Sequence, residues 1–286
     1  MKIGLTFFPV RPQFLVPMAQ RADELGYDSV WLGEHLVFPS KIVSQYPYGD
    51  PNVGPPLTTT PLFDPLITLT YIAAKTQRIQ LGTSVYIAPL RHPVVVAKLV
   101  ASLDAFAGGR VILGVGAGWQ KEEFDTIGAP WEHRGARMEE MIQIMRRLWT
   151  EERVAHHGQF YQFEETGFEP KPARAPVPIM IGGETPVALK RAARCGDGWF
   201  GVRHTPESAA ARVKELRAMR TDDRPFEISL DPNSIPSIDE IRRYRDAGVD
   251  RLVLIARALA GGGKTLEASL DGLTRFAETV MSRIDQ

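Results

Sequence analysis

Several features that commonly define the class of a protein are scarce or absent in this sequence. Its 286 residues include one cysteine, Cys195, so the chain can form neither an internal disulfide nor a CxxC metal or redox motif. Lys and Arg (34) balance Asp and Glu (34) without a basic block, which argues against nucleic-acid and membrane-surface partners. No run approaches the roughly 18 apolar residues of a membrane span, and the N-terminus lacks a signal-peptide pattern. We therefore expect a soluble, cytoplasmic protein.

Motifs that would supply reactive groups from the protein itself are missing too. The six histidines form no HxH or HExxH pattern, so no metal site is expected. The sequence contains neither a GxSxG nucleophile elbow nor a Walker A motif. Lys2, the one lysine within a predicted strand, stands at the strand's beginning, which disfavours Schiff-base chemistry inside a barrel. An organic cofactor is therefore expected to carry the chemistry.

What the sequence does contain is a regular alternation of two kinds of segment. Amphipathic stretches with helical spacing, such as residues 138–148, alternate with short apolar runs. Eight runs are predicted as strands: residues 2–7, 29–32, 79–85, 111–115, 177–181, 199–202, 226–230 and 251–255. Strands that are apolar throughout indicate a parallel sheet covered by helices. Eight units favour a (β/α)8 TIM barrel over an open doubly wound sheet, and we expect residues 1–286 to form one such domain.

Glycines end several of the predicted helices. Gly26, Gly196 and Gly248 each lie between a helical stretch and the next predicted strand. Glycine at this place is typical of a helix that ends in a left-handed residue. We therefore predict a left-handed conformation at all three positions.

Two connections are too long to be ordinary turns. Residues 37–61, rich in Pro and Gly, follow the second strand, and residues 150–176 separate the fourth and fifth strands. We expect both insertions to leave the C-terminal ends of strands, where barrel enzymes have their active sites. They would then act as a lid or as walls of a binding site, with a surface loop or a dimer contact as the alternative.

Glycines also follow the fourth predicted strand, in the sequence GVGAGW at residues 114–119. The spacing is not the complete GxGxxG of a dinucleotide fingerprint, so we reject a Rossmann site. Glycines at a strand's C-terminal end allow a ligand to approach the backbone closely. A tight turn from strand to helix would explain them equally well.

A second glycine motif follows the fifth predicted strand. Gly182 and Gly183 end that strand, Thr185 can cap the next helix, and Pro186 suits its first position. Free backbone N–H groups at such a helix start form a cradle for phosphate. Glu184 weakens the electrostatic argument, so backbone donors would have to dominate. An ordinary capped turn is the alternative.

One histidine stands apart from the other five. His35 follows the second predicted strand, which places it at the C-terminal rim of a barrel. Imidazole can transfer protons near neutral pH. The alternative is a hydrogen-bonded structural residue.

Four phrases together resemble the luciferase-like monooxygenases, and in particular their branch that depends on the deazaflavin coenzyme F420. These phrases occupy residues 19–35, 81–93, 103–123 and 178–199, in the order found in the family. The resemblance covers most of the chain. It implies a (β/α)8 barrel with a flavin or F420 ring at the C-terminal end of the strands.

The resemblance also implies roles for individual residues. The family's proton-handling histidine falls on His35, and its non-proline cis peptide falls between Ser84 and Val85, where a bulge supports the ring. Further cofactor contacts would come from Glu34, Ala117, Gly118, Gly182, Gly183 and Glu184.

One departure from the family concerns the substrate. Trp119 stands where F420-dependent sugar-phosphate dehydrogenases have a glutamate, so the acid–base pair is expected to be incomplete and sugar-phosphate oxidation is disfavoured. Trp119 offers an apolar wall, and with Phe7, Phe8, Trp31 and the lid it favours an apolar or aromatic substrate. The alternative is that these aromatic residues are core.

The leading hypothesis is an F420-dependent oxidoreductase that transfers hydride to or from a small organic molecule. The alternative on the same barrel is a monooxygenase that uses reduced FMN and oxygen. A non-catalytic carrier of the cofactor is a third, weaker reading. The family is commonly dimeric, so residues 93–105 could form a homodimer interface or pack within the chain.

Overall fold

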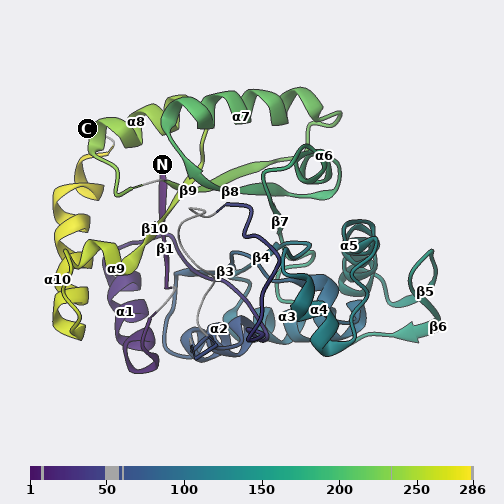
Figure 1. Ribbon diagram of the computed structural model, residues 1–286. Coiled ribbons are helices and arrows are strands. Elements are labelled where there is room, and N and C mark those ends of the chain that lie inside the picture. Colours follow the sequence, from purple (N-terminus) through teal and green to yellow (C-terminus); the bar gives the residue numbers. More distant parts are fainter. Residues whose placement is uncertain (8–9, 49–57, 60, 233, 285–286) are drawn as a thin grey trace.

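Eight parallel strands close into a barrel in the computed structural model, which describes residues 1–7, 10–48, 58–59, 61–232 and 234–284 (Figure 1). The order around the barrel is β1-β10-β9-β8-β7-β4-β3-β2. The strands are β1 (Lys2–Thr6), β2 (Ser29–Leu32), β3 (Gln80–Thr83), β4 (Val111–Val115), β7 (Ile179–Gly182), β8 (Gly198–His204), β9 (Glu227–Pro232) and β10 (Arg251–Ile255). The predicted (β/α)8 TIM barrel is therefore confirmed.

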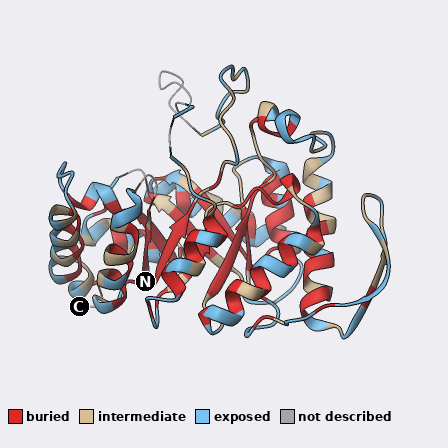
Figure 2. Ribbon diagram, turned by 90° about the horizontal axis from the view of Figure 1, so that it is seen from below, coloured by how far each residue is buried: buried red, intermediate tan, exposed pale blue. Residues whose placement is uncertain are grey.

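Helices surround the barrel and turn their apolar sides inward, so that in Figure 2 the strands are buried and the outer helix faces exposed. Among the described residues they are α1 (Pro12–Glu24), α2 (Pro65–Ala73), α3 (Pro93–Ala107), α4 (Lys121–Ile127), α5 (Arg134–Thr150), α6 (Pro186–Cys195), α7 (Pro206–Met219), α8 (Ile238–Asp246), α9 (Ala256–Leu259) and α10 (Leu266–Thr279), with short 3-10 turns at Ala88–Leu90 and Met281–Arg283. Apolar residues from both layers form one continuous core. Burial of this core is the main driving force for the fold.

The inside of the barrel has a polar layer and an apolar layer. Near the N-terminal ends of the strands the fully buried Arg251 contacts Asp28 at 2.7 Å, Gln80 at 2.8 Å and Glu227. Above it lies an apolar cluster made by Trp31, Ile112, Met180, Phe200 and Val253. The barrel is therefore filled below its C-terminal rim, the end at which TIM-barrel enzymes bind their ligands.

The second insertion lies elsewhere than predicted. It begins after α5, at the N-terminal end of the barrel, and forms a hairpin of β5 (Arg153–His157) and β6 (Gln162–Gly167) on the outside of α5 (Figure 1). The prediction that it leaves a strand's C-terminal end is wrong, because a helix returns the chain to the opposite end before the insertion starts. The hairpin tip runs back along α5, where Glu140 accepts the N–H groups of Phe160 and Tyr161.

The glycines after the helices divide into two groups. Gly26 and Gly248 have φ of 83° and 87°, as predicted. Gly196 is extended, with φ of −87°, so the prediction of a left-handed residue there is wrong. A Cβ at Gly196 would lie 2.9 Å from the carbonyl oxygens of Ala192 and Gly198. Glycine is needed there for close packing rather than for a left-handed backbone.

Candidate active site

A histidine and a glutamate meet where the second and fourth barrel strands end. His35 follows β2, and Glu123 lies in the first turn of α4, after β4. His35 Nδ1 is 2.9 Å from Glu123 Oε2, and Glu123 Oε1 accepts the backbone N–H of Leu36. The side chain of Glu123 is 1% exposed and that of His35 is 15% exposed. The buried carboxylate therefore fixes the orientation of the imidazole ring.

Trp119 determines which ring nitrogen of His35 carries the proton. Its indole Nε1 lies 3.3 Å from His35 Nε2, and the two rings meet edge to face with centroids 5.6 Å apart. An indole N–H can only donate, so Nε2 is the acceptor. The proton must then sit on Nδ1, where it is donated to Glu123. This arrangement holds a neutral imidazole with its basic nitrogen toward Trp119.

Glu123 is a residue that sequence reasoning missed. The substitution of Trp119 for a glutamate led us to expect an incomplete acid–base pair, but Glu123, one helical turn further on, supplies a carboxylate to His35. Two acidic residues in the first turn of a helix after a glycine-rich strand end were the available signal. They also fit the ordinary preference of acidic residues for helix N-termini. The pairing itself joins positions 88 residues apart, which no local pattern shows.

Glu34 supports the chain that follows β3. Its carboxylate accepts the backbone N–H of Ile87 at 2.6 Å and forms an ion pair with Arg91. Burial raises the pKa of Glu34, and the charge of Arg91 partly offsets this effect. The guanidinium of Arg91 also covers the ring of Tyr86, with 4.4 Å from Cζ to the ring centroid. The role of Glu34 in this structure is to hold the segment beside the Ser84–Val85 peptide, and direct contact with a cofactor stays a prediction.

The Ser84–Val85 peptide bond is cis, as the resemblance implied. The side chain of Val85 lies against two glycines, Gly116, which follows β4, and Gly182, which ends β7. A Cβ at Gly116 or Gly182 would come within 2.5 Å of a Val85 methyl group. Gly116 and Gly182 therefore make room for Val85, which places the cis peptide beside the C-terminal ends of β4 and β7.

The start of α6 is the predicted anion cradle. Gly183 has φ of 122°, a conformation that side chains with a Cβ rarely adopt. Thr185 caps the helix by accepting a hydrogen bond from a backbone N–H in its first turn, and Pro186 takes the first position, as predicted. The N–H of Glu184 donates to the hydroxyl of Tyr48 at 3.4 Å. Free N–H groups at a helix start suit an anion, but Pro186 has no N–H, and the N–H groups of Glu184 and Ala188 already have partners. Binding of a phosphate at this cradle therefore stays a prediction.

The carboxylate of Glu184 turns away from this cradle. Its Oε1 accepts the N–H of Val202 at 3.0 Å, and its Oε2 lies 3.1 Å from His204 Nε2 and 3.6 Å from Arg212 Nε. These partners belong to β8 and α7, so the negative charge is directed outward and partly compensated. The carboxylate of Glu184 is therefore engaged by groups of β8 and α7, and anion binding at the cradle stays a prediction.

The described part of the first insertion, residues 37–48, does lie at the C-terminal rim, and we call the insertion, residues 37–61, the lid. Its anchor is Glu122, whose Oε1 accepts the N–H groups of Val43 at 2.7 Å and Ser44 at 3.0 Å. Burial raises the pKa of Glu122, but these backbone hydrogen bonds outweigh it and lower the pKa to about 2. Residues 49–57 and 60 of the lid lie outside the described residues.

Aromatic side chains of the lid continue the wall that Trp119 begins. The ring of Tyr46 lies 5.3 Å from that of Trp119 and 5.6 Å from that of Tyr48, both edge to face. Phe38 lies 5.0 Å from the ring of His35. Two aromatic side chains, Phe38 and Trp119, thus flank His35, and an apolar or aromatic ligand beside it stays a prediction.

Other predicted wall residues lie elsewhere. Trp31 is fully buried inside the barrel and belongs to the core. Phe7 is also buried, in a crevice beside Leu32 and Phe63, so its contact with substrate stays a prediction. Phe8 lies outside the described residues.

Two residues predicted to contact the cofactor, Ala117 and Gly118, follow β4. Ala117 packs against the core, and the carbonyl of Gly118 accepts a hydrogen bond from Arg134 at 3.1 Å.

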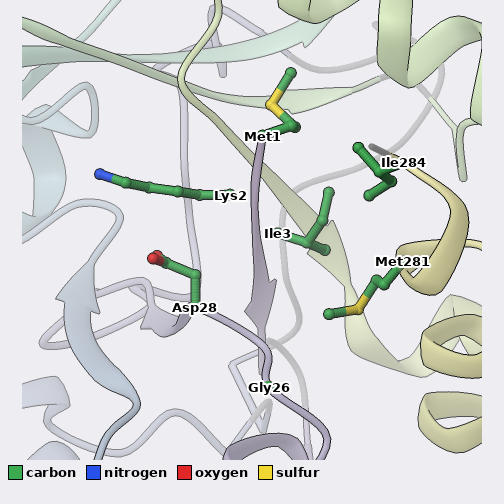
Figure 3. A pocket seen from close by; sticks show the side chains of 7 residues that line it. All are labelled: Met1, Lys2, Ile3, Gly26, Asp28, Met281 and Ile284. Carbon is green, nitrogen blue, oxygen red and sulfur yellow. The ribbon is translucent and has the colours of Figure 1, made fainter. Parts of the chain in front are cut away.

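A separate pocket opens at the other end of the barrel, beside the start of β1 (Figure 3). It is lined by Met1, Lys2, Ile3, Gly26, Asp28, Met281 and Ile284. Because it lies at the N-terminal end of β1, it is not part of the site at the C-terminal rim. Within the described ranges, no cluster of three or more His, Cys, Asp or Glu residues could hold a metal ion, and no helix is long and apolar enough to cross a membrane.

The closed barrel, with polar side chains gathered at the C-terminal ends of its strands, is the architecture of a TIM-barrel enzyme. Residues 6–253 match the family model of luciferase-like monooxygenases, and the chain belongs to this family.

Comparison with individual proteins shows similarity to enzymes with different activities. An F420-dependent glucose-6-phosphate dehydrogenase from Amycolatopsis mediterranei is 34% identical over 77% of this chain and 65% of its own length. Two solved structures share the fold. A monooxygenase from Streptomyces bottropensis superposes with a TM-score of 0.75 at 21% identity, covering 99% of each chain. An F420-dependent secondary alcohol dehydrogenase, in complex with an F420-acetone adduct, superposes with a TM-score of 0.74 at 19% identity, covering 100% of this chain and 99% of that one.

Proposed function

We propose that this protein is an F420-dependent oxidoreductase that transfers hydride between the deazaflavin and a small apolar or aromatic organic substrate. The observation that carries the proposal is the His35–Glu123 pair, which presents a basic nitrogen among aromatic side chains at the barrel rim. The 34% identity to an F420-dependent dehydrogenase supports F420 as the cofactor.

The residues at the rim fit such a cofactor at two points. The cradle at Gly183 and the start of α6 would hold a phosphate of its side chain. The Ser84–Val85 cis peptide, with Val85 packed against Gly116 and Gly182, would support one face of its ring. When bound, the cofactor supplies the hydride chemistry.

The chain itself supplies orientation and a proton site. His35 Nε2 would accept a proton from a substrate hydroxyl, or return one to a carbonyl oxygen, once the substrate takes the place of the Trp119 N–H. Glu123 would stabilise the imidazolium that forms, because its carboxylate already accepts the Nδ1 proton. Trp119, Tyr46 and Phe38 would exclude water from one side of the reacting atoms.

An FMN-dependent monooxygenase is the second candidate. The observation in its favour is the fold, which the chain shares with a monooxygenase at a TM-score of 0.75. The phosphate cradle would serve FMN as well as F420. In that case reduced FMN with oxygen would supply the chemistry, and His35 would again hold the proton.

Titration of the purified protein with F420 and with FMN, followed by fluorescence, tests the choice. We expect tight binding of F420, weak binding of FMN, and weaker binding of F420 to a Gly183→Ala variant. Gly26→Ala is the matched control, because Gly26 also has a positive φ but lies at the other end of the barrel. Tight FMN binding together with oxygen uptake would overturn the proposal in favour of the monooxygenase.

We further propose that the protein forms a homodimer through α2 and α3. These adjacent helices expose Ile67, Tyr71, Val95, Leu99 and Phe106, an apolar surface of the kind that marks an interface. A two-fold axis would place the same helices of the two copies together. Light scattering should give the mass of a dimer, and Phe106→Lys should yield monomers. A monomeric wild-type protein would contradict this proposal.

A further inference from the structure

An acidic side chain at the rim has an oxygen with no partner. Asp231 lies near the end of β9, and its Oδ1 is buried without a hydrogen bond among the described residues. A buried polar atom in a native protein is normally paired, because losing its hydration costs free energy. Asp231 is therefore an exception that needs an explanation.

The register of β9 shows where this side chain points. Ile228 and Leu230 belong to the core between the strands and the helices, whereas Ser229 contacts the guanidinium of Arg251 inside the barrel. Side chains alternate along a strand, so Asp231 shares the inner face with Ser229. Its register partner Val202 packs on the apolar cluster that fills the barrel. Asp231 thus lies on the inner face at the C-terminal rim, one layer above that cluster.

The neighbouring strand is distorted at the same level. The pairing of β8 and β9 is irregular between Val202 and His204, and Arg203 between them has φ of 58°. A bulge of this kind redirects a side chain at a barrel rim, and a left-handed non-glycine residue is unusual enough to suggest a local function. In the part of the chain that the structure describes, Asp231 Oδ1 nevertheless accepts no hydrogen bond from Arg203.

Tyr46 connects this position to the His35 site. Burial raises the pKa of Tyr46, the charge of Arg203 lowers it, and the charge of Asp231 raises it, so both groups act on the Tyr46 hydroxyl. The ring of Tyr46 packs on Trp119, whose indole donates to His35. Tyr46 is therefore close enough to feel the charge of Asp231 and also packs on Trp119, which links Asp231 to the His35 side of the rim.

We propose that Asp231 determines substrate specificity by accepting a hydrogen bond from a hydroxyl or amino group of the substrate. The proposal rests on the proposed function in one respect, namely that an organic substrate enters at the rim. A substrate of this class combines an apolar or aromatic body, for the wall of Trp119 and Tyr46, with a donor group for the unpartnered carboxylate oxygen. Burial raises the pKa of Asp231 to about 6, with Arg203 lowering it, so the carboxylate is mostly ionised at pH 8 and acts as an acceptor.

The test compares matched aromatic probes at pH 8. Benzyl alcohol and benzylamine carry a donor, whereas benzaldehyde carries only an acceptor. Their affinities for the cofactor-loaded protein can be measured by saturation-transfer NMR. We expect the wild type to prefer the donor probes by about tenfold or more, because a site with an unpaired acceptor rejects a ligand that lacks the donor.

Two Asp→Asn substitutions show whether Asp231 causes the preference for donor probes. Asp231→Asn keeps the size of the side chain but removes the charge, and it should reduce the preference to about threefold or less. Asp239→Asn changes an exposed residue at the start of α8 and should leave the preference unchanged. A wild type without preference, as expected if Oδ1 merely binds a water molecule, would overturn the proposal. An unchanged preference in Asp231→Asn would do so too.

The same protein samples also test the role of Asp231 separately from the proposed use of F420. F420 and FMN titrations of the wild type and of Asp231→Asn should agree, since Asp231 is assigned to the substrate. If neither cofactor binds but the unloaded protein still shows an Asp231-dependent preference for the donor probes, the proposed function fails and the Asp231 subsite stands.

Discussion

Replacing Glu123 by Gln should reverse the protonation of His35. In the wild type, Glu123 accepts the Nδ1 proton of His35 and the Trp119 indole donates to Nε2. The introduced glutamine side chain can keep an oxygen on the backbone N–H of Leu36, but it then presents an amide N–H to Nδ1. Nδ1 must become an acceptor, the proton moves to Nε2, and two donors face each other at Trp119.

The size of the effect follows from the hydrogen bonds involved. Bonds to an ionised group contribute about 1.5–3 kcal/mol and neutral bonds about 0.5–1.5 kcal/mol, so weakening two bonds to a buried carboxylate should cost about 2 kcal/mol of stability. Loss of a correctly placed proton acceptor typically costs about 10²–10⁴ in kcat. Cofactor affinity should stay close to that of the wild type, because Glu123 has no place in the phosphate cradle.

Long-range ¹H–¹⁵N NMR of labelled histidine reports the tautomer directly, and a His35→Asn variant assigns the signal. The wild type should show a proton on Nδ1 and Glu123→Gln a proton on Nε2, while urea unfolding measures the loss of stability. Glu122→Gln is the matched control, because Glu122 is adjacent in sequence but bonds to the lid. If the tautomer is the same in the wild type and in Glu123→Gln, the role assigned to Glu123 is wrong.

Three further predictions concern other parts of the chain. Burial raises the pKa of the Cys195 thiol from 9.0 to about 11. Alkylation by iodoacetamide at pH 8 should therefore be about a hundredfold slower in the folded than in the urea-unfolded protein. Equal rates in the two states would contradict this prediction. Gly183→Ala should reduce the free energy of unfolding more than Gly26→Ala. Both positions have positive φ, but only a Cβ at Gly183 would meet another atom, the Cβ of Ala188 at 2.8 Å. Equal losses of stability in the two variants would count against the packed cradle. The pKa of Glu122 is lowered to about 2, so its stabilisation of the lid is fully present above about pH 4.5 and is lost as the pH falls toward 2. Limited proteolysis of the lid should accelerate over that pH range in the wild type, whereas in Glu122→Gln it should be fast throughout. If the wild-type lid is equally resistant at pH 5 and pH 2.5, Glu122 does not anchor it as proposed.

The sequence by itself determined the barrel, because each strand and helix carries its own hydrophobic pattern. Eight apolar runs separated by amphipathic segments have few ways to bury their apolar faces, and a closed parallel sheet covered by helices is one of them. Thr185 and Pro186 likewise predicted the start of α6 correctly, since helix capping depends on residues that are adjacent in the chain. The position of His35 at the rim followed from the strand before it.

Only the tertiary structure decided which side chains meet. The partner of His35 lies 88 residues away, and the orientation of Glu184 depends on His204 and Arg212 from later elements. The extended backbone of Gly196 and the reversed placement of the second insertion also depend on how neighbouring elements pack. Local patterns report backbone conformation and burial, whereas hydrogen bonds and ion pairs across the rim form only after the barrel has brought distant strand ends together.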